Sequence, residues 1–176
     1  MGLTLVDLGT ATRRHMAAEV EGDITGDRLV YSERFSLGGK ARYPDLLRSA
    51  VADHDDEWLA QTLAAPGTFL SHESVVRRGR LTSAKVPVTA PWTFAEGEFN
   101  RFYLRGLCLR AIEEGKAIEV YRAKAVASPR PESTALIGTR FDPRTLLTDL
   151  RTHLAVETAL GLPAGPNSGL SGRIVP

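Results

Sequence analysis

Three charged residues in one apolar segment have the types and spacing best suited to chemistry. Glu98, Arg101 and Arg105 occur at intervals of three and four in TFAEGEFNRFYLRGLCLRAIEEG (93–115). On a helix such residues lie within about 60° of one another and form one polar line. Guanidinium groups suit phosphates and carboxylates. The line predicts either an anion site or internal ion pairs that hold a buried helix in register.

Two further cations follow in the segment AIEVYRAKAV (117–126), which has the composition of a strand. Arg122 and Lys124 join Arg101 and Arg105 as candidate contacts to an anion or a nucleic acid. A metal-dependent nuclease would need Asp/Glu-x-Lys, but Glu119 and Lys124 are five residues apart and point to opposite faces of a strand. The alternative is a half-exposed strand carrying charges.

Other reactive residue types are too isolated to predict a catalytic or metal site. His54-Asp55-Asp56 and His72 supply metal-ligand types, but the remaining ligands of a metal-dependent phosphohydrolase cannot be assigned. Cys108 lies within the most apolar segment and is expected to be a buried hydrophobe. We therefore predict no catalytic residue, no metal and no cofactor, and an enzyme is the less favoured reading.

The basic run Arg77-Arg78-Gly79-Arg80 is the densest local concentration of positive charge. It is short, and acidic residues elsewhere offset it, so it is expected to be a solvated face. The chain as a whole has 22 basic and 21 acidic residues and a net charge of +1. Binding to nucleic acid would therefore require a local patch.

Length and composition indicate one globular domain. The chain has 176 residues, of which 43% are apolar and 24% charged, and this is close to the average for globular proteins. The first residues lack the basic flank and long apolar run expected of a secretory signal, and the sequence has no run of 18 apolar residues. We expect no membrane association and a cytoplasmic location, or a virion if the protein is phage-encoded.

The element pattern predicts an α+β fold built around a long central buried helix, at about 93–114, with flanking helices and a small sheet. Thr93 and Glu96 match a capping box, and Gly115 supplies a left-handed stop. Apolar residues on nearly all sides of this helix indicate that it is covered.

Flanking elements are expected from weaker signals. Helices are predicted at 3–20, from Pro44 to His54, over EWLAQTLAA and from Asp142 onward, and strands at 28–36, within 68–92 and at 117–126. The chain is divided into an N-terminal helix and extended arm (1–40), a globular α+β core (41–160) and a Gly/Pro-rich C-terminal tail (161–176).

Four motifs, EFNRFYLRGLCLRAIEEG, VYRAK, SPRPES and GPNSGLS, span about half of the chain (96–172). In these motifs the chain resembles a family of small uncharacterised proteins of bacterial genomes and their phages. The resemblance implies no established activity and carries over no catalytic residue. It favours a protein of a mobile element or a virion.

These observations lead to two hypotheses of different classes. The first is a non-enzymatic assembly or interaction protein, a phage virion structural component such as a capsid-associated or head–tail protein, whose partners are further copies of itself or other assembly proteins. The second is a nucleic-acid-binding or nuclease-like module that uses Arg101, Arg105, Arg122 and Lys124.

Overall fold

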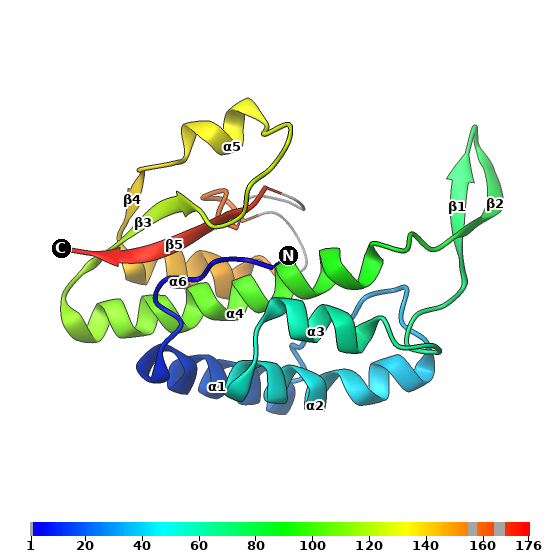
Figure 1. The fold of residues 1–176 in the computed structure, drawn as a ribbon, viewed down its shortest axis with the longest axis horizontal. Helices are drawn as coiled ribbons and strands as arrows, with labels where there is room; N and C mark the ends of the chain where they lie inside the picture. The colour runs from blue at the N-terminus through cyan, green and yellow to red at the C-terminus, as the bar shows by residue number, and fades with distance from the viewer. Residues whose placement is uncertain (1, 155–157, 164–167) are drawn as a thin grey trace.

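The computed structural model describes residues 2–154, 158–163 and 168–176. In chain order its elements are α1 (Thr10–Thr25), α2 (Leu37–Asp53), α3 (Asp56–Leu63), β1 (His72–Arg77), β2 (Arg80–Lys85), α4 (Ala90–Glu114), β3 (Ala117–Arg122), α5 (Pro131–Ala135), β4 (Arg140–Phe141), α6 (Pro143–Thr152) and β5 (Leu170–Val175). Helix α4 runs along the middle of the molecule, with α1, α2 and α3 on one side and the sheet of β3, β4 and β5 on the other (Figure 1). This arrangement confirms the predicted α+β domain with a long central helix.

Helix α4 is buried because its apolar residues occupy most of its circumference. Fifteen of its 25 residues are buried, including Phe99, Tyr103 and Leu107. It packs against α1, α3 and α6 and against strands β3 and β5. Helix α2 also contacts α4, so α4 touches all of the described helices except α5.

The beginning of α4 differs from the prediction, whereas its end agrees. The helix begins at Ala90, and Thr93 lies inside it with its N–H bonded to the carbonyl of Thr89 at 3.0 Å. Pro91 is responsible, because proline is suited to the first turn and starts the helix ahead of the capping-box residues. Gly115 ends the helix in the left-handed conformation, with φ 64°.

Helix α2 also begins earlier than predicted, at Leu37, with Pro44 in its interior. Ser36 caps this end because its hydroxyl accepts a hydrogen bond from the N–H of Gly39 at 2.9 Å. A proline inside a helix removes one backbone hydrogen bond. The predicted start at Pro44 was therefore wrong, and the cap at Ser36 sets the boundary.

The N-terminal segment is extended where a helix was predicted. Residues 3–8 are not helical, and α1 begins at Thr10. The N–H of Leu3 donates to both carboxylate oxygens of Asp56 at 3.1 Å, and the N–H of Thr4 donates to the carbonyl of Ala123 at 2.8 Å. The segment therefore ties α3 to the end of β3.

The small sheet has the order β4-β3-β5 and is antiparallel. Strand β5 lies in the segment predicted to be a tail without regular structure, and it pairs with β3 over six residues from Ala117↔Val175 to Arg122↔Leu170. The sequence LSGRIV gives a weak strand signal because serine and glycine interrupt its apolar residues. A Cβ at Gly172 would lie 2.7 Å from Ile118 Cγ2, so pairing this close to the core requires glycine.

The structure confirms the predicted cap at Asp142, whose carboxylate accepts a hydrogen bond from the N–H of Thr145 at 2.8 Å and opens α6. The short helix α5 replaces part of the loop predicted after β3. The segment predicted as a strand at 28–36 contains a single bridge, Phe35↔Phe69.

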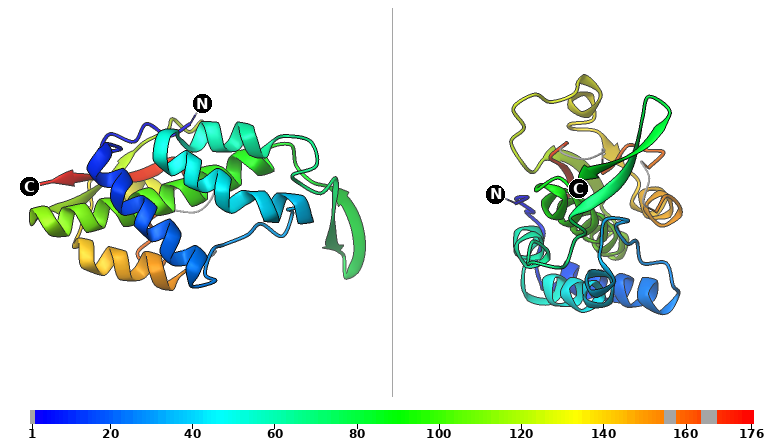
Figure 2. Two further views of the ribbon diagram at one scale, coloured as in Figure 1. Left: turned by 90° about the horizontal axis from the view of Figure 1, so that it is seen from below. Right: turned by 90° about the vertical axis from the view of Figure 1, so that its right-hand side faces the viewer.

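Strands β1 and β2 form a hairpin that projects from one end of the molecule (Figures 1 and 2). A loop and one strand were predicted here, and the structure has two strands paired from His72↔Lys85 to Arg77↔Arg80. Arg78 and Gly79 form the turn, with φ values of 51° and 74°. Two consecutive positive values are typical of the tight turn that matches the twist of a two-stranded hairpin.

Candidate functional site

Arg105, the centre of the predicted polar line, lies in a buried ion network between α4 and α1. Its Nε is 2.6 Å from Glu19 Oε2 and its Nη1 is 2.5 Å from Asp23 Oδ2. Arg151 of α6 also binds Glu19, and Arg28 Nε is 3.3 Å from Asp23 Oδ1. Two carboxylates and three guanidinium groups therefore join three helices and the loop after α1.

The charges of this network stabilise one another. Burial by itself raises the pKa of Glu19, but hydrogen bonds from Arg151 and the charge and hydrogen bond of Arg105 outweigh it, so the pKa lies below its ordinary value. Burial likewise lowers the pKa of Arg105, and the contacts with Asp23 and Glu19 raise it above normal. Both groups remain ionised at neutral pH.

An open pocket of about 450 Å³ adjoins this network and is lined by Ala18, Glu19, Gly22, Asp23, Arg28, Arg105 and Arg151. Its carboxylates are the two that already bind arginine. The polar wall of the pocket is therefore the outer side of a structural ion network.

Arg101 is buried on the same helix and has different partners. Its Nη1 donates to the carbonyl of His153 at 2.5 Å, and its Nε lies 3.6 Å from Glu98 Oε1. Burial raises the pKa of Glu98 to about 7, although the nearby charges of Arg101 and Arg105 lower it. Arg101 Nε and the hydroxyl of Tyr43 have no hydrogen-bond partner among the residues that the structure describes.

Arg122 and Lys124, at the end of β3, bind elsewhere. Arg122 Nη1 donates to the carbonyl of Ser168 at 2.9 Å, and Lys124 Nζ lies 2.5 Å from Glu96 Oε2. Because Arg101 and Arg105 are buried and these two are half-buried, the four predicted cations do not form one exposed patch. Each has internal acceptors, as in the structural reading of the polar line.

The residues considered for metal binding serve local structure. Asp55 caps α3 by accepting the N–H of Trp58 at 2.8 Å, Asp56 accepts the N–H of Leu3, and the ring of His54 stacks on Trp58 at 4.1 Å. In the described part of the chain, no group of three or more His, Cys, Asp or Glu side chains is arranged to hold a metal ion. Burial raises the pKa of the Cys108 thiol, which disfavours the reactive thiolate.

The hairpin of β1 and β2, here called the arm, is the feature that sequence reasoning missed. Apart from pairing with each other, its strands make no extensive contact with any other helix or strand among the described elements. Val76 and Leu81 are direct cross-strand partners near the turn, and they are 71% and 74% exposed. An isolated two-stranded hairpin is marginally stable in water, so an apolar pair at its tip is expected to be covered by a partner.

Four further apolar side chains are exposed near the base of the arm. Leu37, in the first turn of α2, is 88% exposed, and Val88, between β2 and α4, is 87% exposed. Leu70 and Trp92, at the root of the arm and in the first turn of α4, are exposed as well. We call these four residues the root patch.

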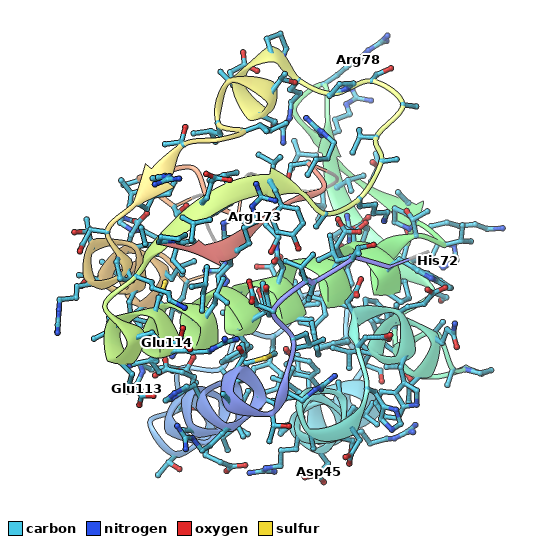
Figure 3. All side chains as sticks on the ribbon, turned by 60° about the vertical axis from the view of Figure 1, so that its left-hand side comes forward. Asp45, His72, Arg78, Glu113, Glu114 and Arg173 are labelled. Atoms are coloured by element: carbon cyan, nitrogen blue, oxygen red, sulfur yellow. The ribbon has the colours of Figure 1, made fainter. Side chains whose placement is uncertain are left out.

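Charge is concentrated on the arm. Residues 72–85 contain three arginines and one lysine against one acidic residue, giving +3, whereas the whole chain carries +1. The acidic residue, Glu73, is bound by Arg34 at 2.7 Å. Arg78, Arg80 and Lys85 make no hydrogen bond or ion pair with the described residues, and Figure 3 shows Arg78 at the outer edge of the molecule.

A signal for the arm was present in the sequence. Arg78-Gly79 stands between the β-favouring residues SVV and LTS, the arrangement of a two-residue hairpin. Arginine is uncommon in the left-handed turn position, where asparagine or glycine is usual, so the turn was less evident.

None of the described helices is both long and apolar enough to cross a membrane. No family model, curated protein or solved structure matches the chain in comparisons with known proteins. The features that bear on function are therefore the arm, the root patch and the internally paired charges.

Proposed function

We propose that the protein is a non-enzymatic assembly protein that binds further copies of itself through the β1–β2 arm. The observation that carries this proposal is the arm itself, which projects from the body (Figure 1) and has an exposed apolar pair, Val76 and Leu81. The paired state of the buried charges in α1, α4 and α6 supports a structural role for the polar line of Glu98, Arg101 and Arg105 rather than a catalytic one.

A second copy is the partner that the surface chemistry favours. The apolar pair of one arm can cover the root patch of a neighbouring copy, and a two-fold axis would form this contact twice. The fourteen arm residues and the four root-patch residues together approach the roughly 20 residues per side of a standard interface. The resemblance of segment 96–172 to bacterial and phage proteins supports a more specific proposal. The protein would be a structural component of a virion, either capsid-associated or a head–tail protein.

The arm's positive charge gives this contact a distinctive salt dependence. Two arms brought together repel each other, and added salt screens that repulsion. Association through the apolar residues should therefore strengthen from low to moderate salt.

The test is the mass of the full chain in solution, measured by light scattering over a wide range of concentration at low and at moderate salt. We expect a dimer or larger species that the double variant V76S/L81S converts to a monomer. The matched control is V6S/I137S, which replaces two exposed apolar residues away from the arm and should leave the mass unchanged. A wild-type monomer under all conditions, or equal association of the two variants, would refute the proposal. Circular dichroism checks that both variants fold.

A further inference from the structure

The cations of the arm suggest a second kind of contact, different from the apolar one. Arg78 lies in the turn, Arg80 follows it as the first residue of β2, and Lys85 is the last residue of β2. These side chains have no internal partner in the described structure, unlike the buried Arg101 and Arg105. Three solvated cations on a projecting element form a local field that the near-neutral whole chain lacks.

The geometry of the arm matches a groove of double-stranded DNA. Paired strands lie about 4.8 Å apart, and a two-stranded ribbon with its side chains fits the major groove of B-form DNA, which is about 12 Å wide. The corresponding groove of A-form RNA is deep and narrow and does not admit such an element. Arg78 and Arg80 would then lie beside the phosphates that border the groove.

The apolar pair adds to this fit. Val76 and Leu81 stand on one face of the ribbon, immediately below the turn. Proteins that contact DNA through basic extensions frequently place apolar side chains against base edges or between base steps. The basic turn is therefore suited to the phosphates of DNA, and the exposed apolar pair below it is suited to the bases.

We propose that the β1–β2 arm binds double-stranded DNA without sequence specificity, with Arg78, Arg80 and Lys85 contacting phosphates. The inference rests on the proposed function only in treating the arm as the binding element. Two features separate the proposals. Self-association depends on Val76 and Leu81 without the arginines and strengthens with salt, whereas DNA binding requires the arginines and weakens with salt.

The experiment measures binding of the full chain to a labelled DNA duplex of about 20 base pairs and mixed sequence, by fluorescence anisotropy at several salt concentrations. With three phosphate contacts, the logarithm of the affinity should fall with the logarithm of the salt concentration with a slope of about −3. An RNA duplex of the same length should bind at least about tenfold more weakly.

The decisive variant is R78N/R80S. Asparagine readily adopts the left-handed backbone conformation of position 78, so R78N removes the charge and keeps the hairpin turn. Its affinity at low salt should fall at least about tenfold, and its salt slope should decrease in magnitude by about 2. The control R130S/R144S removes two exposed arginines outside the arm and should bind within about twofold of the wild type.

Equal effects of the two variants, an unchanged slope in R78N/R80S, or equal affinity for the RNA duplex would each overturn the DNA proposal. Light scattering of the same samples keeps the two proposals separate. If R78N/R80S loses DNA but retains its mass, the arm has both activities. If the wild type binds DNA as a monomer, the DNA proposal stands and self-association fails.

Discussion

Arg105 of α4 and Asp23 of α1 form an ion pair between two buried side chains, with Nη1 2.5 Å from Oδ2. Glu19, one turn earlier on α1, accepts the Nε of the same guanidinium at 2.6 Å. A charge pair of this kind is weak evidence for net stability, because desolvation offsets most of the attraction. Removing one member has a large effect, however, because the others remain buried and charged.

We therefore predict that Arg105→Met destabilises the protein by about 3–5 kcal/mol, because Glu19 and Asp23 lose their shared partner. Arg110→Met is the matched control on the same helix. Arg110 pairs with Glu114 near the surface, and its loss should cost less than about 1 kcal/mol. Urea unfolding followed by circular dichroism measures both. Similar losses in the two variants would contradict a structural role for the buried network.

This network shows what a single sequence predicts about a charged site. The helical spacing of Glu98, Arg101 and Arg105 correctly placed them on a buried helix, because spacing within one helix is local information. Glu19 and Asp23 lie 86 and 82 residues away from Arg105 in the chain. Glu19 and Asp23 become the partners of Arg105 only because α1 packs against α4. A local sequence pattern does not predict that packing.

The predicted start of α4 was wrong because two local signals for a helix start lie close together in the sequence. Pro91 and the pair Thr93 and Glu96 both indicate a helix start, and the earlier signal determines it. Strand β5 has almost no signal of its own and is defined by its pairing with β3. The arm was missed for a different reason, since Arg78 occupies a turn position where arginine is not expected.

Gly106 of α4 lies in close contact with α1. A Cβ there would lie 2.9 Å from the carbonyl oxygen of Thr12 and 3.0 Å from the backbone nitrogen of Met16. These are backbone atoms of a packed helix and cannot move without shifting α1. Gly97, on the same helix, has no atom within 4 Å of its corresponding position.

Gly106→Ala should therefore destabilise the protein by about 1–3 kcal/mol through overpacking. Gly97→Ala should stabilise it by about 0.5–1 kcal/mol, because alanine loses less backbone entropy in a helix than glycine does. Thermal unfolding of the two variants provides the comparison. Stabilisation of both variants would show that helix propensity, and not the contact with α1, dominates at Gly106.

Glu98 offers a test of the buried polar centre through pH. Its carboxyl group is buried, and its pKa is raised to about 7, from about 4.5 in an unfolded chain. Between these values the unfolded chain releases this proton while the folded protein keeps it. The stabilising contribution of the group is therefore fully present below about pH 4.5 and is lost as pH rises through 7.

Glu98→Gln removes this titration and keeps the shape of the side chain. Relative to the wild type, its free energy of unfolding should increase by about 1–3 kcal/mol between pH 5 and pH 8. Asp56, whose pKa burial raises to about 6, titrates in the same range, but it is present in both proteins and cancels in the difference. Urea unfolding at several pH values measures that difference. A difference that stays constant with pH would mean that Glu98 is ionised in the folded protein at pH 5, with Arg101 and Arg105 outweighing its burial.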